Sequence, residues 1–439
     1  MLLRAILAAL LLAVPASLQA QAPPATESDQ LPATFMLDAD AHTLNSRQAA
    51  DGGGVLGKSA RGSVLGVDSL VNFSSYFYFP GFDSFGNIQF TWPYTMVGRS
   101  PFRGEEDREE EDDQTTRIGA PVVAVNLDLR TATGAPRFTP NGSPLISTAT
   151  QHVTPTLNSP LFSDAVFDSS ERPTQFTDAL QRAEFFHTAS EDWHTLLKPH
   201  VRTTRTMVLR QAPAGKPPIY QFSLNPDGTC CRFVLIDINA FVNAFFPATA
   251  ADTTTPIGAA ENAGDITTRD MSTFLFNNAF LFFGTSANCC VVGFHTYDLE
   301  PGSAANGWRE KRYVLNYSSW VSPGIFRSNS FLDVAALSHE LSETFNDPFV
   351  NNATPWWLAP NGLCQNNLET GDVIENLPNA QSTMTLNGFT YHVQNEAMLE
   401  WFAGETPSSA IHHAYSYPNT AVLTSAATSQ NVNCTPPLP

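Results

Sequence analysis

Charged residues are scarce in this chain of 439 residues, and basic residues are the scarcer kind. Asp, Glu, Lys and Arg make up 15% of the sequence, well below the roughly 25% of typical soluble domains. The 23 Lys and Arg stand against 42 Asp and Glu, which leaves a formal net charge of -19. Because this charge repels a phosphate backbone, the composition argues against a nucleic-acid-binding protein.

Long apolar runs are missing as well. The run nearest the start, Ala5–Val14, follows Arg4 and is broken by Pro15, and it is shorter than the ~20 residues that a membrane-spanning helix needs. A positive start, a short apolar centre and small residues around Ala20 are typical of a secretory signal peptide. We therefore expect residues 1–20 to be removed, the protein to be secreted, periplasmic or extracellular, and no segment to span a membrane.

The sequence also lacks a Gly-x-Ser-x-Gly elbow, the motif of one large class of serine hydrolases. Its six cysteines form an even set, which in an exported protein predicts disulfides. Neighbouring cysteines bond to each other only with backbone strain. We therefore expect the doublet Cys230–Cys231 to pair with the doublet Cys289–Cys290, and Cys364 to pair with Cys434. A four-thiolate zinc site is the alternative, although such sites normally separate their ligands by two to four residues.

The composition predicts a loop-rich protein with a substantial sheet, because low charge is combined with 32 Pro and 26 Gly. Residues 105–113 hold eight acids in nine positions, and such a block is typical of a solvated loop. We expect an N-terminal segment at 21–117, with a poorly ordered leader, short strands and this acidic loop. The main domain should then cover residues 118–439.

The main domain is expected to be α+β, with a mixed sheet. Residues 175–197 carry apolar side chains at helical spacing and predict one helix. A hairpin is expected at 383–394, around the turn sequence Asn387-Gly388. Further strands are predicted at 118–129, 201–209, 217–223, 230–237, 272–283, 288–297 and 312–320.

A second helix is predicted between Ser330 and Pro348. Ser330 and Asp333 resemble a capping box at its start, and Pro348 marks its end. One side of this helix carries an apolar stripe at helical spacing, and the other side carries polar residues. The stripe consists of Val334, Leu337, Leu341 and Phe345, and the polar side of His339, Glu340, Glu343 and Asp347.

His339 and Glu343 lie four positions apart and are therefore neighbours on one face of the helix. With Glu340 they form His-Glu-x-x-Glu, a variant of the His-Glu-x-x-His zinc motif in which a carboxylate replaces the second imidazole. Two ligands one turn apart can hold a tetrahedral metal and leave room for water. Glu340 could then take a proton from that water as general base. The alternative is that these residues are only the solvated face of an amphipathic helix.

A third metal ligand must come from elsewhere in the chain. Glu369 and Asp372 are the candidates, and Glu369 is favoured because 26 residues after Glu343 suffice for the chain to turn back over the helix. Asp372 would join the ligands or orient His339 from outside. Asp347 and His295 are the remaining alternatives. The expected cofactor is Zn2+ or another divalent metal, since carboxylate ligands also suit harder ions such as calcium and manganese.

The strand at 312–320 followed by His-Glu-Leu-Ser-Glu resembles the zincin metallopeptidases, in which a strand binds substrate beside the metal helix. Residues 338–348 are also similar to a segment of the secreted phosphate-induced, EXORDIUM-like proteins. The Glu-x-Gly-Asp at 369–372 is similar to one in related bacterial exported proteins. The resemblance covers residues 288–375. It implies a zincin-like fold, with His339 and Glu343 as ligands, Glu340 as the base and Glu369 or Asp372 completing the shell.

Two classes of function follow. The first is a secreted metal-dependent hydrolase, peptidase-like, that acts on a peptide or protein substrate with metal-activated water. The second is a non-catalytic extracellular or cell-envelope protein with a structural metal site. A metal with an open position over a cleft would favour the first class, and a closed shell of protein ligands would favour the second.

Overall fold

The computed structural model describes residues 67–81, 88–102, 114–304, 307–326, 331–358 and 364–427. The expected signal peptide, the leader and the acidic loop at 105–113 lie outside these residues. In the described part of the chain, no helix is both long and apolar enough to cross a lipid bilayer.

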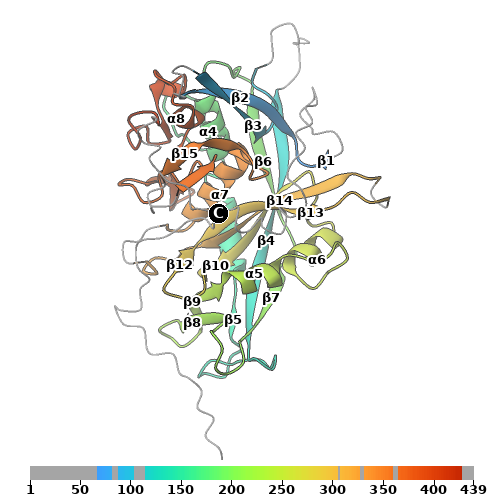
Figure 1. Ribbon diagram of the computed structural model, residues 1–439. Helices are drawn as coiled ribbons and strands as arrows, with labels where there is room; N and C mark the ends of the chain where they lie inside the picture. The colour runs from blue at the N-terminus through green and yellow to red at the C-terminus, as the bar shows by residue number, and fades with distance from the viewer. Residues whose placement is uncertain are drawn as a thin grey trace, which may run out of the picture.

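A mostly parallel sheet forms the centre of the molecule (Figure 1). Its strands are β1 (Val67–Asp68), β4 (Thr115–Arg130), β5 (Ile146–Ser147), β6 (His194–Val201), β7 (Arg205–Arg210), β10 (Met271–Asn277), β13 (Gly293–Glu300) and β14 (Glu310–Trp320). The long strand β4 pairs in parallel with β6, β7 and β10, and β10 pairs in parallel with β14. The strand β13 is antiparallel and pairs with β14. The predicted mixed sheet is confirmed. The expected class was α+β, whereas a mainly parallel sheet is typical of an α/β structure, in which long crossover connections join the parallel strands.

Different elements cover the two faces of this sheet. Alternate residues of β4 point to opposite faces, so Val122 and Ala124 join one hydrophobic cluster while Val123 and Val125 join another. The first face carries α7 (Ala335–Asn346) and α4 (Phe176–Glu184). The second face carries α5 (Ile238–Phe245), α6 (Pro256–Asn262) and a small sheet of β8 (Tyr220–Leu224), β9 (Cys230–Asp237), β11 (Ala279–Phe282) and β12 (Cys289–Val291).

Short hairpins and turns surround α7. They are β2 (Asn72–Gly81) with β3 (Ile88–Val97), β15 (Ala353–Leu358) with β16 (Cys364–Asn367), β17 (Gln381–Leu386) with β18 (Phe389–Gln394), and β19 (Glu396–Ala397) with β20 (Ser416–Tyr417). The short helices are α3 (Val153–Leu157) and α8 (Leu399–Phe402). The β17–β18 pair is the hairpin predicted at 383–394, and Asn387 and Gly388 form its turn with φ of 52° and 80°.

The expected boundary at residue 117 falls inside β4, which begins at Thr115. The described part of the N-terminal segment lies against the rest of the chain. β1 adds to the edge of β14, and the Thr95 backbone N–H of β3 donates to the Asn352 side chain at 2.8 Å. The division into a segment at 21–117 and a domain at 118–439 stays a prediction.

The helix predicted over 175–197 is shorter in the structure. α4 ends at Glu184, and β6 begins at His194. The Arg182 guanidinium donates to the Trp193 carbonyl at 2.7 Å and so fixes the turn between them. Trp193 was included in the predicted helix because its position continues the helical spacing. In the structure Trp193 lies beyond the helix, and it is buried against Phe185.

Two predicted strands are each divided in the structure. The run at 272–283 forms β10 in the main sheet and β11 in the small sheet, with Asn278 at a φ of 45° between them. The run at 201–209 covers the end of β6 and most of β7. The helices α5 and α6 were not predicted.

The predicted disulfide between the two cysteine doublets is wrong. β11 lies between β9 and β12, so roughly 9–10 Å separates the two strands that carry the doublets. The doublets are also offset along these strands, because Phe282 of β11 pairs with both Asp237 and Cys289. A disulfide joins Cα atoms that are usually about 4.4–6.8 Å apart. The two sulfur atoms of each doublet lie next to each other, Cys230 beside Cys231 and Cys289 beside Cys290. Cys364 is disulfide-bonded, and its expected partner Cys434 lies outside the described residues.

Candidate metal centre

The helix α7 is buried on every side. It packs against β13, β14, β18, α4 and β3, and all twelve of its residues are buried. The apolar stripe joins the hydrophobic cluster on this face of the sheet. The opposite side is buried too, and His339, Glu340 and Glu343 are each 0% exposed. The explanation that these polar residues form a solvated helix face is therefore wrong.

The start of α7 differs from the predicted capping box. The helix begins at Ala335 after Val334, which supplies no side-chain cap. The Asp333 carboxylate accepts instead from the backbone N–H groups of Val334 at 2.7 Å and His392 at 2.9 Å. Because Asp333 ties the helix start to β18, it is not available to cap the first turn. Ser330 lies outside the described residues.

Six ionisable side chains converge beside α7. Three come from the helix, one from β13 and two from the segment that follows β16: His339, Glu340, Glu343, His295, Glu369 and Asp372. Among them, the donor atoms of His339, Glu343 and Asp372 lie within 4.8 Å of one another. The donor atoms of His295, Glu340 and Glu343 form a second such group. Glu343 belongs to both groups.

The distances within the cluster suit donors around a cation. His339 Nε2 lies 3.0 Å from Glu343 Oε2 and 3.7 Å from Asp372 Oδ1. Ligand atoms about 2.0–2.2 Å from a tetrahedral zinc are roughly 3.3–3.6 Å from one another. His339, Glu343 and Asp372 could therefore hold one metal ion without large rearrangement.

The structure separates the two candidates for the third ligand. Asp372 approaches His339, whereas Glu369 Oε2 lies 3.7 Å from His295 Nε2. His295 in turn lies 3.4 Å from Glu343 through Nδ1, so Glu369 adjoins the group that contains Glu340. Asp347 is occupied elsewhere, because its two oxygens accept from the backbone N–H groups of Asn351 and Asn352 at 2.9 and 3.0 Å.

Three of the four carboxylates are held by one oxygen and offer the other to the cluster. Glu343 Oε1 accepts from the backbone N–H groups of Gly371 at 2.9 Å and Asp372 at 3.3 Å. Glu369 Oε1 accepts from Asn367 at 2.7 Å, and Asp372 Oδ2 accepts from Gln365. Partners of this kind orient ligands in metal sites.

The imidazole of His339 is also held in place. The side-chain amide of Gln394 lies between His339 Nδ1 and the Gly371 carbonyl, 2.8 Å from each. The anchoring residues Gln365, Asn367 and Gln394 were not predicted, because uncharged amides carry no ligand signal in a sequence.

The polar atoms that face the centre of the cluster make no hydrogen bond. They are both nitrogens of His295, His339 Nε2, both oxygens of Glu340, Glu343 Oε2 and Glu369 Oε2. Each buried polar atom without a partner costs about 1–3 kcal/mol. Coordination of a cation would satisfy several of these atoms at once, so the donor set fits a metal ion.

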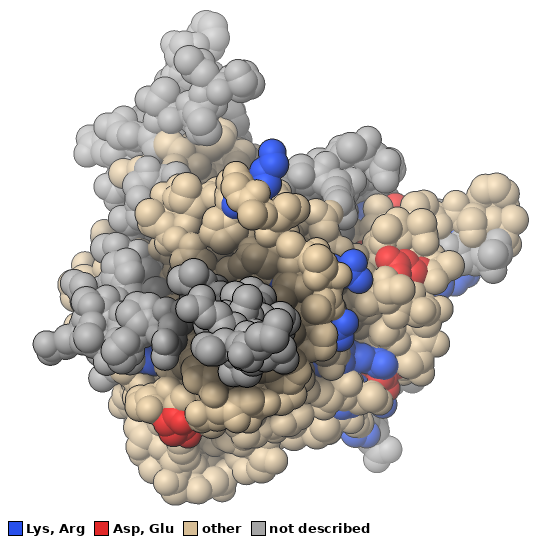
Figure 2. Space-filling model, turned by 90° about the horizontal axis from the view of Figure 1, so that it is seen from below, with Lys and Arg blue, Asp and Glu red and all other residues tan. Residues whose placement is uncertain are grey.

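Many acidic side chains of the described residues are buried. On the face seen in Figure 2, Asp and Glu are sparse among the described residues. Among the described residues, twelve acids are buried: Asp178, Glu184, Asp298, Asp333, Glu340, Glu343, Asp347, Glu369, Asp372, Glu375, Glu396 and Glu400. In the described part of the chain, Arg312 is the sole buried Lys or Arg. The carboxylates of the α7 cluster form ion pairs in this part with His295 and His339 alone, so four acids share two imidazoles and no Lys or Arg.

The pKa values reflect this imbalance. Burial alone would lower the pKa of His339, but the charge of Glu343 outweighs it and raises this pKa well above its usual value. Burial would raise the pKa of Glu343, yet His339 and His295 lower it to about 2. Burial raises the pKa of Glu340 to about 7 and, with the charge of Glu343, that of Asp372 to about 6. Glu343 is thus the carboxylate most firmly ionised, as a shared ligand should be.

No family model, curated protein or solved structure matches this chain. The chemistry of the centre therefore has to be inferred from the geometry of its side chains.

Two glycines make room for the centre. A Cβ atom at Gly371 would lie 2.2 Å from His339 Nδ1, and one at Gly293 would lie 2.2 Å from Glu340 Oε1. Real Cβ atoms essentially never come this close, so either substitution must displace its neighbour.

We expect Gly371→Ala to weaken metal binding by roughly 10- to 100-fold, the usual cost of disturbing a residue that orients a ligand. Gly293→Ala should retain metal, because it displaces Glu340 and touches no member of the His339 group. Competition titration with a chromophoric chelator measures both affinities. Equal losses in the two variants would contradict this assignment of roles.

Proposed function

We propose that this protein is a metal-dependent hydrolase, peptidase-like, whose centre lies on α7. His339, Glu343 and Asp372 would hold the ion, and Zn2+ suits this mixed imidazole and carboxylate set, although another divalent metal remains compatible with it. When bound, such an ion supplies a Lewis acid that polarises a carbonyl group and makes a water molecule more acidic.

The observation that carries the proposal is the state of Glu340. Glu343, Glu369 and Asp372 each have one anchored oxygen, whereas neither oxygen of Glu340 has a hydrogen-bond partner. A structural ligand would be held like the other three. Glu340 lies 3.7 Å from His295 and has a pKa of about 7, so it can accept a proton from water and return it to a leaving group near neutral pH.

The surroundings of α7 also support a peptide substrate. In the zincins, which the His-Glu-x-x-Glu segment resembles, a strand binds substrate beside the metal helix. β13 lies against α7 and, among the described strands, pairs with β14 alone. A strand thus lies beside the metal helix here too, and a peptide bound in extended form could run along it.

A structural metal site is the second candidate, and the burial of the centre favours it. His295, His339, Glu340 and Glu343 are 0% exposed, and Glu369 and Asp372 are 1% and 4% exposed. A closed shell of protein ligands is typical of structural sites, whereas catalytic sites keep a position for water or substrate. On this account the ion fixes α7 to the segment around Gly371.

Replacing Glu340 tests the hydrolase directly. We expect Glu340→Gln to keep its metal and to lose hydrolysis by about 100- to 10,000-fold, the usual contribution of a general base. The assay would use the full chain loaded with Zn2+ and a mixed-sequence fluorogenic peptide library, with metal content measured on the same samples.

Glu375→Gln is the matched control, since Glu375 is a buried acid of the same segment that belongs to neither donor group. It should retain both metal and hydrolysis. Hydrolysis by Glu340→Gln at the wild-type rate would show that another group, or a contaminating enzyme, activates the water. A metal-loaded wild-type protein that cleaves no peptide would favour the structural site.

A further inference from the structure

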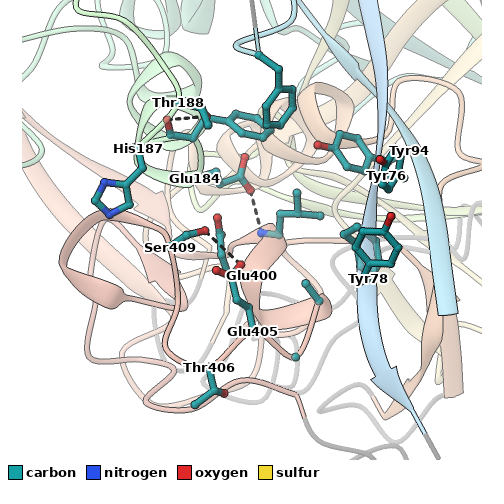
Figure 3. Close-up of a pocket in the computed structure, with 16 residues that line it drawn as sticks. Tyr76, Tyr78, Tyr94, Glu184, His187, Thr188, Glu400, Glu405, Thr406 and Ser409 are labelled. Atoms are coloured by element: carbon teal, nitrogen blue, oxygen red, sulfur yellow. Dashed lines mark hydrogen bonds between the residues drawn. The ribbon is translucent and has the colours of Figure 1, made fainter. Parts of the chain in front are cut away.

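A cavity apart from the metal centre lies between the β2–β3 hairpin, the end of α4 and the segment that begins with α8. Its volume is about 660 Å³, within the range of roughly 300–1,000 Å³ that small-molecule sites occupy. Figure 3 shows Tyr76, Tyr78 and Tyr94 on one side of this cavity, with Glu184 and Glu400 in the middle. Neither carboxyl group belongs to the metal centre.

Both carboxyl groups are buried and incompletely paired. Glu184 and Glu400 are 2% and 4% exposed. Glu184 Oε1 accepts from Asn346 Nδ2 and from the Leu399 backbone N–H, each at 3.2 Å, but its Oε2 has no partner. Glu400 Oε2 has no partner either. Both residues line the cavity, and each keeps one buried carboxyl oxygen without a hydrogen-bond donor.

The cavity also lacks a strong cation. Its described lining includes neither Lys nor Arg, and His187 is its basic side chain. Burial raises the pKa of Glu184 to about 8, and burial together with the charge of Glu184 raises that of Glu400 well above its usual value. Two neighbouring buried acids can both ionise only if a positive charge lies between them.

The remaining walls are largely aromatic. Burial raises the pKa of Tyr94, and the charges of Glu184 and Glu400 raise it further, because both carboxyl groups lie nearby. Phe102 and Phe185 meet edge to face at 5.6 Å, while Tyr76 and Tyr78 are about half exposed at the rim. Aromatic faces attract ammonium and guanidinium groups, and they also cover the hydrocarbon part of such ligands.

We propose that this cavity binds an organic cation with a primary ammonium or guanidinium group on an aliphatic chain. The charged head lies between Glu184 and Glu400, and the chain lies against the aromatic walls. A bare metal ion suits the cavity less well, because hard cations need six or more oxygen ligands and two are offered here without a partner. A neutral sugar would leave both acids without a counter-charge.

The cation could be a free amine or a basic side chain of a polypeptide, and calorimetry with three probes separates these sources. Agmatine represents the free amine, the peptide acetyl-Gly-Arg-Gly-amide represents the side chain, and 1,5-pentanediol is the neutral comparison. We expect at least one cationic probe to bind the full-length protein at least about tenfold more tightly than the diol, a difference worth one charge-assisted hydrogen bond. The tighter of the two cations identifies the source.

Single amide substitutions locate the site. Glu184→Gln and Glu400→Gln should each weaken binding of the tighter cation by about tenfold or more. Both variants should fold, because burial favours the uncharged form of each acid and an amide is also uncharged. Glu405→Gln is the matched control, because Glu405 lines the same cavity but its carboxylate already accepts from Ser409 at 3.1 Å.

Binding should also release protons. The other titratable groups that line the cavity are Tyr76, Tyr78, Tyr94, His187, Glu400 and Glu405. A cation would convert Glu184 from acid to carboxylate. Affinity should therefore rise with pH through about 8, the pKa at which Glu184 ionises without a ligand. Heats measured in two buffers of different ionisation enthalpy report the protons released.

Three outcomes would overturn the proposal. One is that neither cation binds at about 10 mM, which is weaker than a specific site allows. Another is that the diol or a disaccharide such as cellobiose binds as tightly as the cations. The third is that Glu184→Gln and Glu400→Gln bind the cations as the wild-type protein does.

Discussion

Glu343→Ala should abolish stoichiometric metal binding. Glu343 Oε2 lies 3.0 Å from His339 Nε2 and 3.4 Å from His295 Nδ1, and Glu343 is the residue common to both donor groups. Glu343 Oε1 accepts from the backbone N–H groups of Gly371 and Asp372. These two hydrogen bonds hold the carboxylate in place, and the shorter side chain of alanine offers no replacement for it. We expect metal content to fall from about one equivalent to below about 0.1, because a three-ligand site cannot lose a ligand and hold its ion. Elemental analysis after gel filtration measures it.

Substitutions at the neighbouring acids should rank below this one. Asp372→Ala should weaken binding more than Glu369→Ala, since Asp372 approaches His339 and Glu369 approaches His295. Glu340→Gln should retain its metal. If Glu343→Ala kept a full equivalent while Glu369→Ala lost it, the ion would lie beside His295, and the assignment of ligands would need to change accordingly.

Removal of the metal should destabilise the folded protein strongly. The centre joins α7, β13 and the segment around Gly371, and without an ion it leaves several buried polar atoms without partners. A ligand at 1,000 times its dissociation constant adds about 4 kcal/mol to the free energy of unfolding. We therefore expect a chelator to lower the unfolding free energy by roughly that amount, as measured by urea denaturation, and added Zn2+ to restore it.

The same experiment on Glu343→Ala provides the control. This variant should unfold at the same urea concentration with and without chelator, because it holds no metal to remove. If the wild-type protein lost its metal completely and kept its full stability, the ion would contribute nothing to the fold. That result would exclude the structural-site account and leave the hydrolase as the sole candidate.

The elements with strong local patterns could be predicted from the sequence. The apolar stripe from Val334 to Phe345 predicted a helix, and α7 covers Ala335–Asn346. The strand predicted at 230–237 is β9, and the turn sequence Asn387-Gly388 lies where the hairpin turns. Each of these patterns involves residues close together in the chain, so the element can be predicted without knowledge of the tertiary structure.

The disulfide pairing, the end of α4 and the start of α7 depend on contacts between segments far apart in the chain. Local sequence patterns do not reveal these contacts. β11 separates the two cysteine doublets. Trp193 continues a helical spacing that the chain abandons after Glu184, because Arg182 binds the carbonyl of residue 193. Asp333 resembles a helix cap but is used to hold β18.

In the candidate site, too, the residues that one helix brings together could be predicted, whereas those that tertiary contacts bring together could be predicted only in part. His339, Glu340 and Glu343 could be predicted because one helical turn brings them together. Glu369 and Asp372 were chosen as ligand types on a segment able to fold back, and the structure brings both to the cluster but exchanges their order of proximity to His339. His295 was one of ten histidines, and only the pairing of β13 with β14 beneath α7 brings it to Glu343.

The metal content of the full-length protein, purified without chelators, tests the central claim most directly. Inductively coupled plasma mass spectrometry should find about one equivalent of a divalent metal per chain, retained by Glu340→Gln and lost from Glu343→Ala. A wild-type protein that carries no metal, and takes up none from an excess of Zn2+ or Mn2+, would contradict the account.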